Sequence, residues 1–275
     1  MKEIDEKIDE LVKGTEARLK KLERIIFNEV ADYLSSNLFI DVGEGSDLFI
    51  QKQNISFTPH NAGVIASIDR LLSKFSPAIQ KIGKYIISGI KSVLGLTTQQ
   101  LTKVDVRAEK NSLIIDELLT HSATIINKDM TLEKIFTNIK QQAIALMTDP
   151  KGIDLKELRS ELKSNIIDNK LAQRYYSRWT HDLYSQMQRV GANKIRLNLG
   201  LKYAIYQGGL IKTSRPFCEE RNGKCFSEEE INSWNTEEWE GKPEGYNAIV
   251  DCGGYNCRHR LDWVSEQMAK RLRSN

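Results

Sequence analysis

All four cysteines of the 275-residue chain fall between positions 218 and 257. In a reducing cytoplasm, clustered cysteines bind metal more often than they form disulfides. From Thr213 onward the helical pattern gives way to turn residues and tryptophans, and this segment has too little apolar content to build a core of its own. A small module of that kind needs a metal ion or a bridge as an added constraint. We therefore predict a compact C-terminal Cys/His module over residues 209–275.

The cysteines form two candidate metal-binding knuckles with a nearby histidine. One knuckle is Cys218-x6-Cys225 and the other is Cys252-x4-Cys257-x-His259. Structural zinc sites draw thiolate and imidazole ligands from two such local groups. Five candidates compete for the four ligand positions, and we favour Cys218, Cys257 and His259 together with either Cys225 or Cys252. The alternative is that Cys225 and Cys252 are free or paired buried thiols and that His259 is a core histidine hydrogen-bonded to the backbone.

The N-terminal residues 1–36 have the pattern of one long amphipathic helix. Apolar residues recur there at three- and four-residue steps among Lys and Glu, namely at Ile4, Ile8, Val12, Leu19, Leu22, Ile26 and Val30. This narrow stripe suits a helix-helix seam within the chain or between copies, so self-association through the helix is one expectation. Residues 37–60 change character and predict an extended or hairpin excursion, with β-prone runs at 48–50 and 55–57.

Helical periodicity resumes over residues 61–208, which we predict to form a helical domain. The expected helices cover approximately 62–90, 98–126, 131–147, 155–167 and 170–206, followed by a candidate strand at 210–212. Asp129 and Thr131 resemble a helix start, because a side-chain oxygen there can accept from a free amide of the first turn. The predicted fold is therefore mainly α, with long N-terminal helices and a small α+β C-terminal module.

Composition excludes a disordered or membrane-spanning chain. Hydrophobic residues make up 40% and charged residues 28%, as in well-mixed globular or elongated helical proteins. The first residues are charged and lack the apolar core of a secretory signal. The most apolar region, 79–96, is interrupted by Lys81, Lys84 and Lys91. We expect a cytoplasmic product with no membrane partner.

Charge is distributed unevenly although the formal net charge is only +3. Residues 156–215 are rich in Lys and Arg, the following block to residue 251 is acidic, and the tail is basic again. The favoured interpretation is solvated helix faces and pairing between these blocks. The alternative is that the basic stretch contacts DNA phosphates. The residues that carry this weaker nucleic-acid hypothesis are Arg174, Arg178, Arg189, Lys194, Arg196 and Lys202.

The C-terminal motifs resemble those of phage head morphogenesis proteins of the Mu F-like minor head family. The likeness rests on three runs in order, Thr213-Ser214-Arg215-Pro216-Phe217-Cys218, Asn222-Gly223-Lys224 and Gly253-Gly254-Tyr255-Asn256-Cys257-Arg258-His259-Arg260. It covers roughly residues 179–264. The chain departs from the family pattern in a longer acidic insert over 228–244 and in Ser214, where Asp is common.

The resemblance implies a minor virion protein made in the host cytoplasm and carried into the phage head. It would assemble with the portal or the major capsid protein, near packaged DNA, and it would have no catalytic residues in this role. The alternative function is a zinc-stapled DNA-binding or nuclease-like protein, with His259 as a base and Asp251 and Asp262 as helpers. We expect no enzymatic activity, because neither a catalytic triad order, a phosphate-binding glycine loop nor an H-E-x-x-H motif occurs in the sequence.

Overall fold

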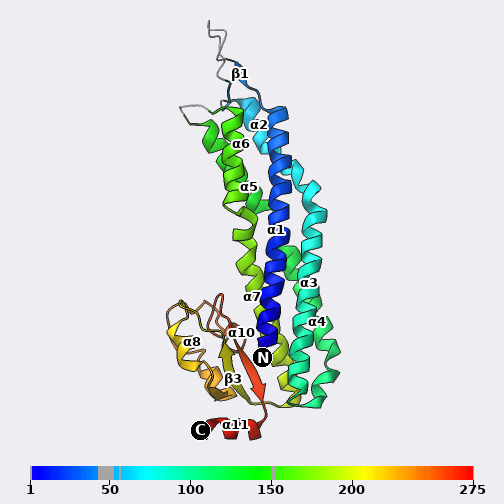
Figure 1. Cartoon of the computed structure of the whole chain (residues 1–275), viewed down its shortest axis with the longest axis vertical. Coiled ribbons are helices and arrows are strands. Elements are labelled where there is room, and N and C mark those ends of the chain that lie inside the picture. Colours follow the sequence, from blue (N-terminus) through cyan, green and yellow to red (C-terminus); the bar gives the residue numbers. More distant parts are fainter. Residues whose placement is uncertain (1, 43–52, 56, 150–152, 275) are drawn as a thin grey trace. The chain divides into compact units, whose positions relative to one another are not determined.

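The computed structural model describes residues 2–42, 53–55, 57–149 and 153–274. It is mostly helical and carries a small antiparallel sheet near the C-terminus, which confirms the predicted fold class (Figure 1). The chain divides into two compact units. Unit 1 comprises Met1–Lys13, Lys84–Ile126 and Arg178–Asn275, and unit 2 comprises Gly14–Gly83 and Asn127–Ser177. Four of the described helices contribute residues to both units: α1 (Lys2–Asn37), α3 (Leu72–Thr102), α4 (Ser112–Asp129) and α7 (Leu171–Leu199).

Unit 2 is built from helices and one very short strand pair. Strands β1 (Asp41–Val42) and β2 (Gln53–Asn54) pair antiparallel inside the predicted 37–60 excursion, whereas the β-prone run 48–50 lies outside the described residues. The other elements of this unit are α2 (Pro59–Ala66), η1 (Ser67–Leu71), α5 (Glu133–Met147), α6 (Leu155–Lys163) and the π-helical turn η3 (Ser164–Asp168).

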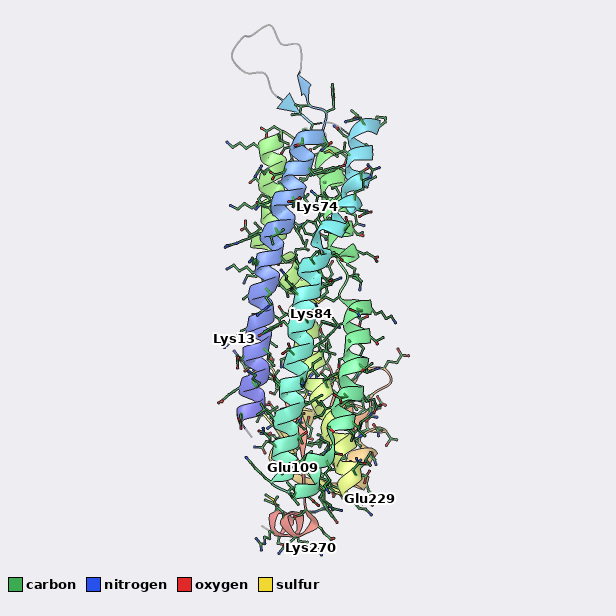
Figure 2. The ribbon with its side chains drawn as sticks, turned by 90° about the vertical axis from the view of Figure 1, so that its right-hand side faces the viewer. Lys13, Lys74, Lys84, Glu109, Glu229 and Lys270 are labelled. Atoms are coloured by element: carbon green, nitrogen blue, oxygen red, sulfur yellow. The ribbon has the colours of Figure 1, made fainter. Side chains whose placement is uncertain are left out.

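The apolar stripe of α1 is buried as the spacing predicts. Ile4 and Ile8 are buried in unit 1, and Leu19, Leu22, Ile26 and Val30 are buried in unit 2, while Val12 is half-buried. The stripe is therefore covered within a single chain. Self-association through α1 stays a prediction. The polar faces of the long helices are solvated. In unit 1, for example, Lys13 of α1 and Lys84 of α3 are both exposed (Figure 2).

The predicted helix 98–126 is wrong because an aspartate interrupts it. Helix α3 ends at Thr102, and the carboxylate of Asp105 accepts from the backbone N–H of Arg107 to start the short helix η2 (Val106–Lys110). Helix α4 (Ser112–Asp129) then begins anew. The predicted cap before α5 is wrong as well, because that helix begins after Leu132 without a side-chain cap.

The largest error in the sequence prediction lies at the end of α7. The helix stops at Leu199 and Gly200 adopts a φ of +71°, a left-handed value that suits glycine. Residues Tyr203–Gly208, predicted to be helical, form strand β3, in which Ala204 and Tyr206 are buried and their neighbours are not. Alternate burial is the pattern of a strand with one packed face. The candidate strand 210–212 is instead an exposed connection.

The C-terminal part of unit 1 surrounds a three-stranded sheet of order β4-β3-β5. Its other two strands are β4 (Cys225–Ser227) and β5 (His259–Val264), both antiparallel to β3. The accompanying short helices are α8 (Pro216–Arg221), α9 (Glu228–Ser233), α10 (Ala248–Asp251) and α11 (Glu266–Arg273).

This module shares its core with the helices of unit 1. Tyr206, Phe217, Trp234 and Trp263 pack in one buried cluster that also includes residues of α3, η2 and α7: Leu101, Ala108, Ala192, Ile195 and Leu199. The low apolar content of the segment is thus offset by aromatic side chains and by borrowed helix surface. In the part of the chain that the structure describes, no helix has the length and apolarity needed to cross a membrane.

Candidate metal centre

Three of the predicted ligands meet in one buried cluster. Cys218, Cys257 and His259 are each at most 4% exposed, and their ligand atoms all lie within 4.8 Å of one another. The two sulfurs are 3.9 Å apart, and Cys257 Sγ is 3.7 Å from His259 Nδ1. The group can hold a metal ion.

These separations match the edges of a zinc tetrahedron. Zinc binds sulfur at about 2.3 Å and imidazole nitrogen at about 2.0–2.1 Å, so two bound sulfurs lie about 3.8 Å apart and a sulfur and a nitrogen about 3.6 Å. Two edges of the cluster therefore match a tetrahedral zinc site, and the third, between Cys218 Sγ and the His259 ring, is at most 4.8 Å. The chemistry of the donors, two thiols and one imidazole, suits zinc better than the oxygen-seeking ions Mg²⁺ and Ca²⁺.

Local backbone geometry brings the ligands together. Cys218 lies on α8, whose first residue is Pro216, and His259 opens β5 directly opposite Gly208 of β3. A Cβ at position 208 would lie 2.6 Å from the His259 Cα atom, so only glycine allows this close approach of the two strands. The glycine thus fixes the position of the imidazole.

The Cys257 sulfur has the surroundings of a thiolate. It accepts hydrogen bonds from the backbone N–H groups of Gly253 at 3.2 Å and His259 at 3.3 Å. The hydrogen bond from the Cys218 thiol, together with those from His259 and the positive charge of Arg189, lowers the pKa of Cys257 well below its usual range despite burial. A thiolate is the form that binds metal.

Gly253 and Tyr206 close one side of the cluster. A Cβ at position 253 would lie 2.2 Å from Cys218 Sγ and 2.9 Å from Cys257 Sγ, so the backbone rests directly on both sulfurs. The Tyr206 hydroxyl is 3.3 Å from Cys218 Sγ, and its ring stacks on the His259 ring with centroids 4.9 Å apart. Sequence reasoning missed Tyr206, because it placed this residue in a helix. The short β-prone run Tyr203-Ala204-Ile205-Tyr206 after Gly200 is the sequence signal that could have identified the strand.

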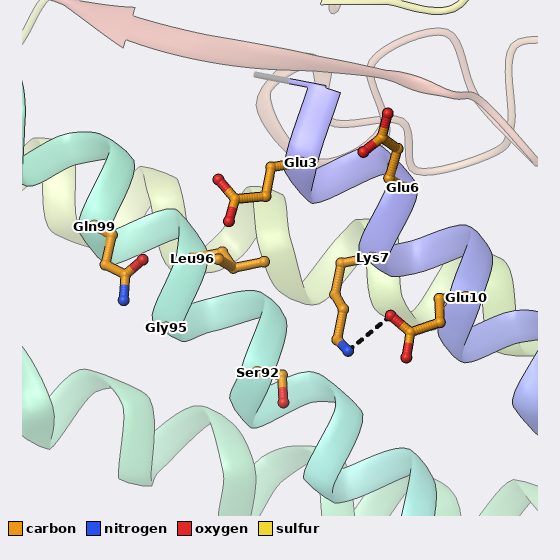
Figure 3. A pocket seen from close by; sticks show the side chains of 8 residues that line it. All are labelled: Glu3, Glu6, Lys7, Glu10, Ser92, Gly95, Leu96 and Gln99. Atoms are coloured by element: carbon orange, nitrogen blue, oxygen red, sulfur yellow. Dashed lines mark hydrogen bonds and ion pairs between the residues drawn. The ribbon is translucent and has the colours of Figure 1, made fainter.

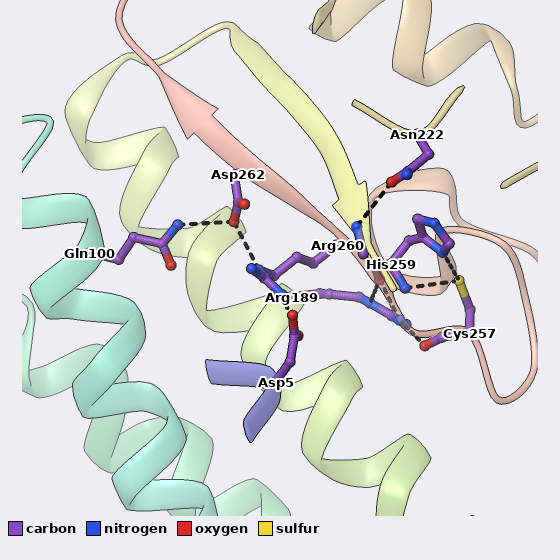
Figure 4. A network of polar contacts seen from close by, with 9 residues as sticks. Asp5, Gln100, Arg189, Asn222, Cys257, His259, Arg260 and Asp262 are labelled. Carbon is purple, nitrogen blue, oxygen red and sulfur yellow. Dashed lines mark hydrogen bonds and ion pairs between the residues drawn. The ribbon is translucent and has the colours of Figure 1, made fainter. Parts of the chain in front are cut away.

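Arg189 of α7 orders the segment that carries the ligands Cys257 and His259, which we call the ligand loop. Its guanidinium donates to the carbonyl oxygens of Val250 at 3.0 Å, Cys257 at 2.6 Å and His259 at 2.7 Å, and the side chain is buried (Figure 4). The planar guanidinium, with five donors, is suited to bridging several carbonyls. These bonds order the backbone on both sides of Cys257 and His259.

A second buried arginine anchors β5. Arg260 pairs with Asp262 at 2.9 Å and with Asp5 of α1, and Gln100 of α3 donates to Asp262 at 3.0 Å (Figure 4). The four side chains tie the strand that carries His259 to two helices of unit 1. Asp262, considered above as a catalytic helper, is thus engaged in ion pairing.

The remaining cysteines do not join the cluster. Cys225 is half-buried on the edge strand β4, where burial raises the pKa of its thiol. Cys252 is fully buried with a φ of +51°, and burial raises the pKa of its thiol to about 12. Among the residues that the structure describes, no fourth Cys, His, Asp or Glu reaches the three ligands. Cys225 and Cys252 therefore have the surroundings of ordinary thiols.

The residues proposed for nucleic-acid contact fall into two groups. Arg189 and Arg196 are buried, and Arg196 pairs with Glu228 at 2.8 Å while stacking over the Trp263 ring. Lys194 pairs with Glu117 at 2.6 Å. The exposed members of the set are Arg174, Arg178 and Lys202. Buried guanidiniums serve the fold, so only the exposed side chains can meet a phosphate directly.

Away from the metal cluster, a pocket of about 470 Å³ lies between α1 and α3 within unit 1 (Figure 3). The α1 residues Glu3, Glu6 and Glu10 line it with exposed carboxylates, and Lys7 pairs with Glu10 at 2.9 Å. The pocket is a solvated groove between two polar helix faces. Its residues resemble ordinary surface pairs more than a binding site.

Comparison with known proteins gives no relative for the chain: neither a protein-family model, nor a curated protein, nor a solved structure matches it.

Proposed function

We propose that the chain is a minor head protein of a bacteriophage, with a C-terminal module stapled by a structural zinc ion. One observation carries the proposal: Cys218 and the Cys257-Arg258-His259 element, which belong to separate runs of the family signature, meet in a single buried cluster. If the motifs matched by chance, their Cys and His side chains would not be expected to lie together in the fold. Convergence at ligand spacing favours a genuine module of the Mu F-like kind.

The order of elements is compatible with the three runs of the resemblance. Strand β3 comes before them, and residues Thr213 to Cys218 of the first run pass from a turn into α8. In the Asn222-Gly223-Lys224 turn, Gly223 has a φ of +79° and donates to the Tyr206 carbonyl, while Asn222 accepts from the Gly208 N–H. The Asn222-Gly223-Lys224 motif thus hydrogen-bonds to β3, the strand that lies beside the proposed metal ligands.

The surroundings of His259 favour a ligand over a general base. The side chain is 3% exposed, its Nδ1 faces a sulfur, and its Nε2 has no hydrogen-bond partner among the described residues. A base needs access to the proton that it removes. The structural proposal therefore accounts for this residue better than the nuclease alternative does.

Particle analysis tests the proposal. Mass spectrometry of purified phage particles should detect the chain in a few copies, and the tagged protein should capture the portal or the major capsid protein. Cys218→Ser should weaken incorporation, whereas the matched control Cys225→Ser, outside the cluster, should not. A folded protein that is absent from particles and captures neither head protein would overturn the proposal.

A further inference from the structure

The three ligands leave one tetrahedral position without a protein donor. Within the described part of the chain, the cluster contains only two sulfurs and one imidazole. A structural zinc site closes its shell with a fourth protein ligand, whereas a site with three protein ligands keeps its last position for water or another small molecule. The identity of the fourth ligand therefore decides what kind of metal centre this is.

The surroundings of the cluster are asymmetric. One side is closed by the Gly253 backbone and the Tyr206 hydroxyl, which contact the sulfurs directly. Elsewhere Cys218, Cys257 and His259 themselves line a small cavity of about 30 Å³. By this measure of volume a cavity needs about 10–15 Å³ to hold one water molecule, so the space is sufficient for a small ligand.

The rest of the cavity wall favours a neutral or anionic donor. It is formed by polar, basic and apolar residues of the 209–215 connection and the 256–258 turn, namely Gly209, Ile211, Thr213, Ser214, Arg215, Asn256 and Arg258. Among the described residues, two arginines and no Asp or Glu line the cavity. Positive charge beside an open coordination position attracts anions and disfavours a second cation.

The two spare thiols are poorly placed to fill the position. Cys225 pairs in register with Ile205, three residues along β3 from Gly208, which faces His259. At Cys252 the left-handed backbone turn is followed by Gly253, and it is Gly253 that faces both sulfurs. Bringing either thiol to the metal requires movement of a strand or of a buried turn.

We propose that the metal centre is an open Cys2His site whose fourth ligand comes from solution: water, replaceable by a small anion that enters between Arg215 and Arg258. This inference rests on the metal binding proposed above and changes its character. The ion would staple the module and at the same time keep one exchangeable position, instead of being enclosed by Cys225 or Cys252.

Cobalt(II) spectroscopy of the full-length protein tests this inference, because its thiolate charge-transfer bands report bound sulfur and its visible bands report coordination. We expect cobalt to bind with charge-transfer intensity typical of two thiolates, and sodium azide to change the visible bands. Cys252→Ser and Cys225→Ser should keep both properties. Tyr206→Phe, which removes the hydroxyl near the sulfurs, should keep the azide response as well.

Two results would overturn the inference, and a third would refute the metal binding on which it rests. A spectrum that ignores azide, with lower charge-transfer intensity in Cys252→Ser or Cys225→Ser, would mean a closed three-thiolate site. An azide response that appears only in Tyr206→Phe would make Tyr206 the fourth ligand. Absence of any cobalt spectrum in the folded, reduced wild-type protein would instead refute the underlying metal proposal, which separates the two failures.

Discussion

Gly253→Ala is the most informative single substitution in the module. The added methyl would lie 2.2 Å from Cys218 Sγ and 2.9 Å from Cys257 Sγ. Nonbonded heavy atoms sit about 3.5–4.0 Å apart, so the nearer sulfur or the backbone must move by roughly 1.3 Å or more. Metal sites tolerate deviations of only about 0.2 Å in ligand distance. The substitution should therefore disturb both core packing and metal binding.

The expected losses of stability and of zinc affinity follow from these displacements. Overpacking of a buried site costs about 1–3 kcal/mol, which corresponds to about 2–4 °C in Tm per kcal/mol for chains of comparable size. Zinc affinity should fall at least about tenfold, as when the support of a ligand is lost. Thermal unfolding with and without zinc, and zinc competition against a chromophoric chelator, measure the two effects.

Gly209→Ala is the matched control for this experiment. Gly209 belongs to the same module and lines the cavity beside the ligands, but a Cβ there would meet no described atom within 4 Å. The control should keep the wild-type Tm and zinc affinity. A Gly253→Ala protein with wild-type Tm and wild-type zinc affinity would refute the close packing of Gly253 against the sulfurs.

Three further predictions concern stability. Arg189→Met leaves three buried carbonyls without their donor and should lower the free energy of unfolding in urea by about 3 kcal/mol or more, whereas the exposed Arg178→Met should change it by less than about 0.5 kcal/mol; equal effects would contradict the proposed clamp. Burial raises the pKa of Tyr176 to about 12, above its unfolded value of about 10, so its stabilising contribution is complete below pH 10 and is lost as the pH rises towards 12. Tyr176→Phe should therefore show a shallower loss of stability in alkaline urea titrations, and an unchanged slope would argue against this assignment. Removing zinc with a chelator should shift the fluorescence of the buried Trp234 and Trp263 to longer wavelength, and identical spectra with and without chelator would count against a structural ion.

The helical character of the chain could be predicted from residue spacing. Ile4, Leu22 and Ile26 recur at helical steps and are buried in the structure. The ends of the helices were harder to predict, because single residues determine them. Asp105 ends one predicted helix through a local hydrogen bond to Arg107, and Gly200 ends another through its left-handed backbone. Such local competition leaves little trace in an apolar periodicity.

Part of the metal centre could also be predicted. Cys218, Cys257 and His259 stood out because they are rare residue types in one short segment, and the structure brings them together. The supporting residues carry no such signal. Tyr206 looks like the end of a helix, and Arg189 looks like a surface charge in a basic stretch until the fold buries it beneath the ligand loop. Their roles depend on contacts between residues far apart in the sequence.

Metal analysis of the purified protein tests the central claim most directly. Protein prepared without chelator under reducing conditions should contain about one zinc ion per chain by inductively coupled plasma mass spectrometry, as expected for a single site. His259→Ala and Cys218→Ser should lose the ion, while Cys225→Ser should retain it. A folded wild-type protein without zinc, or a Cys218→Ser protein that binds zinc as tightly as the wild type, would contradict a metal centre at Cys218, Cys257 and His259.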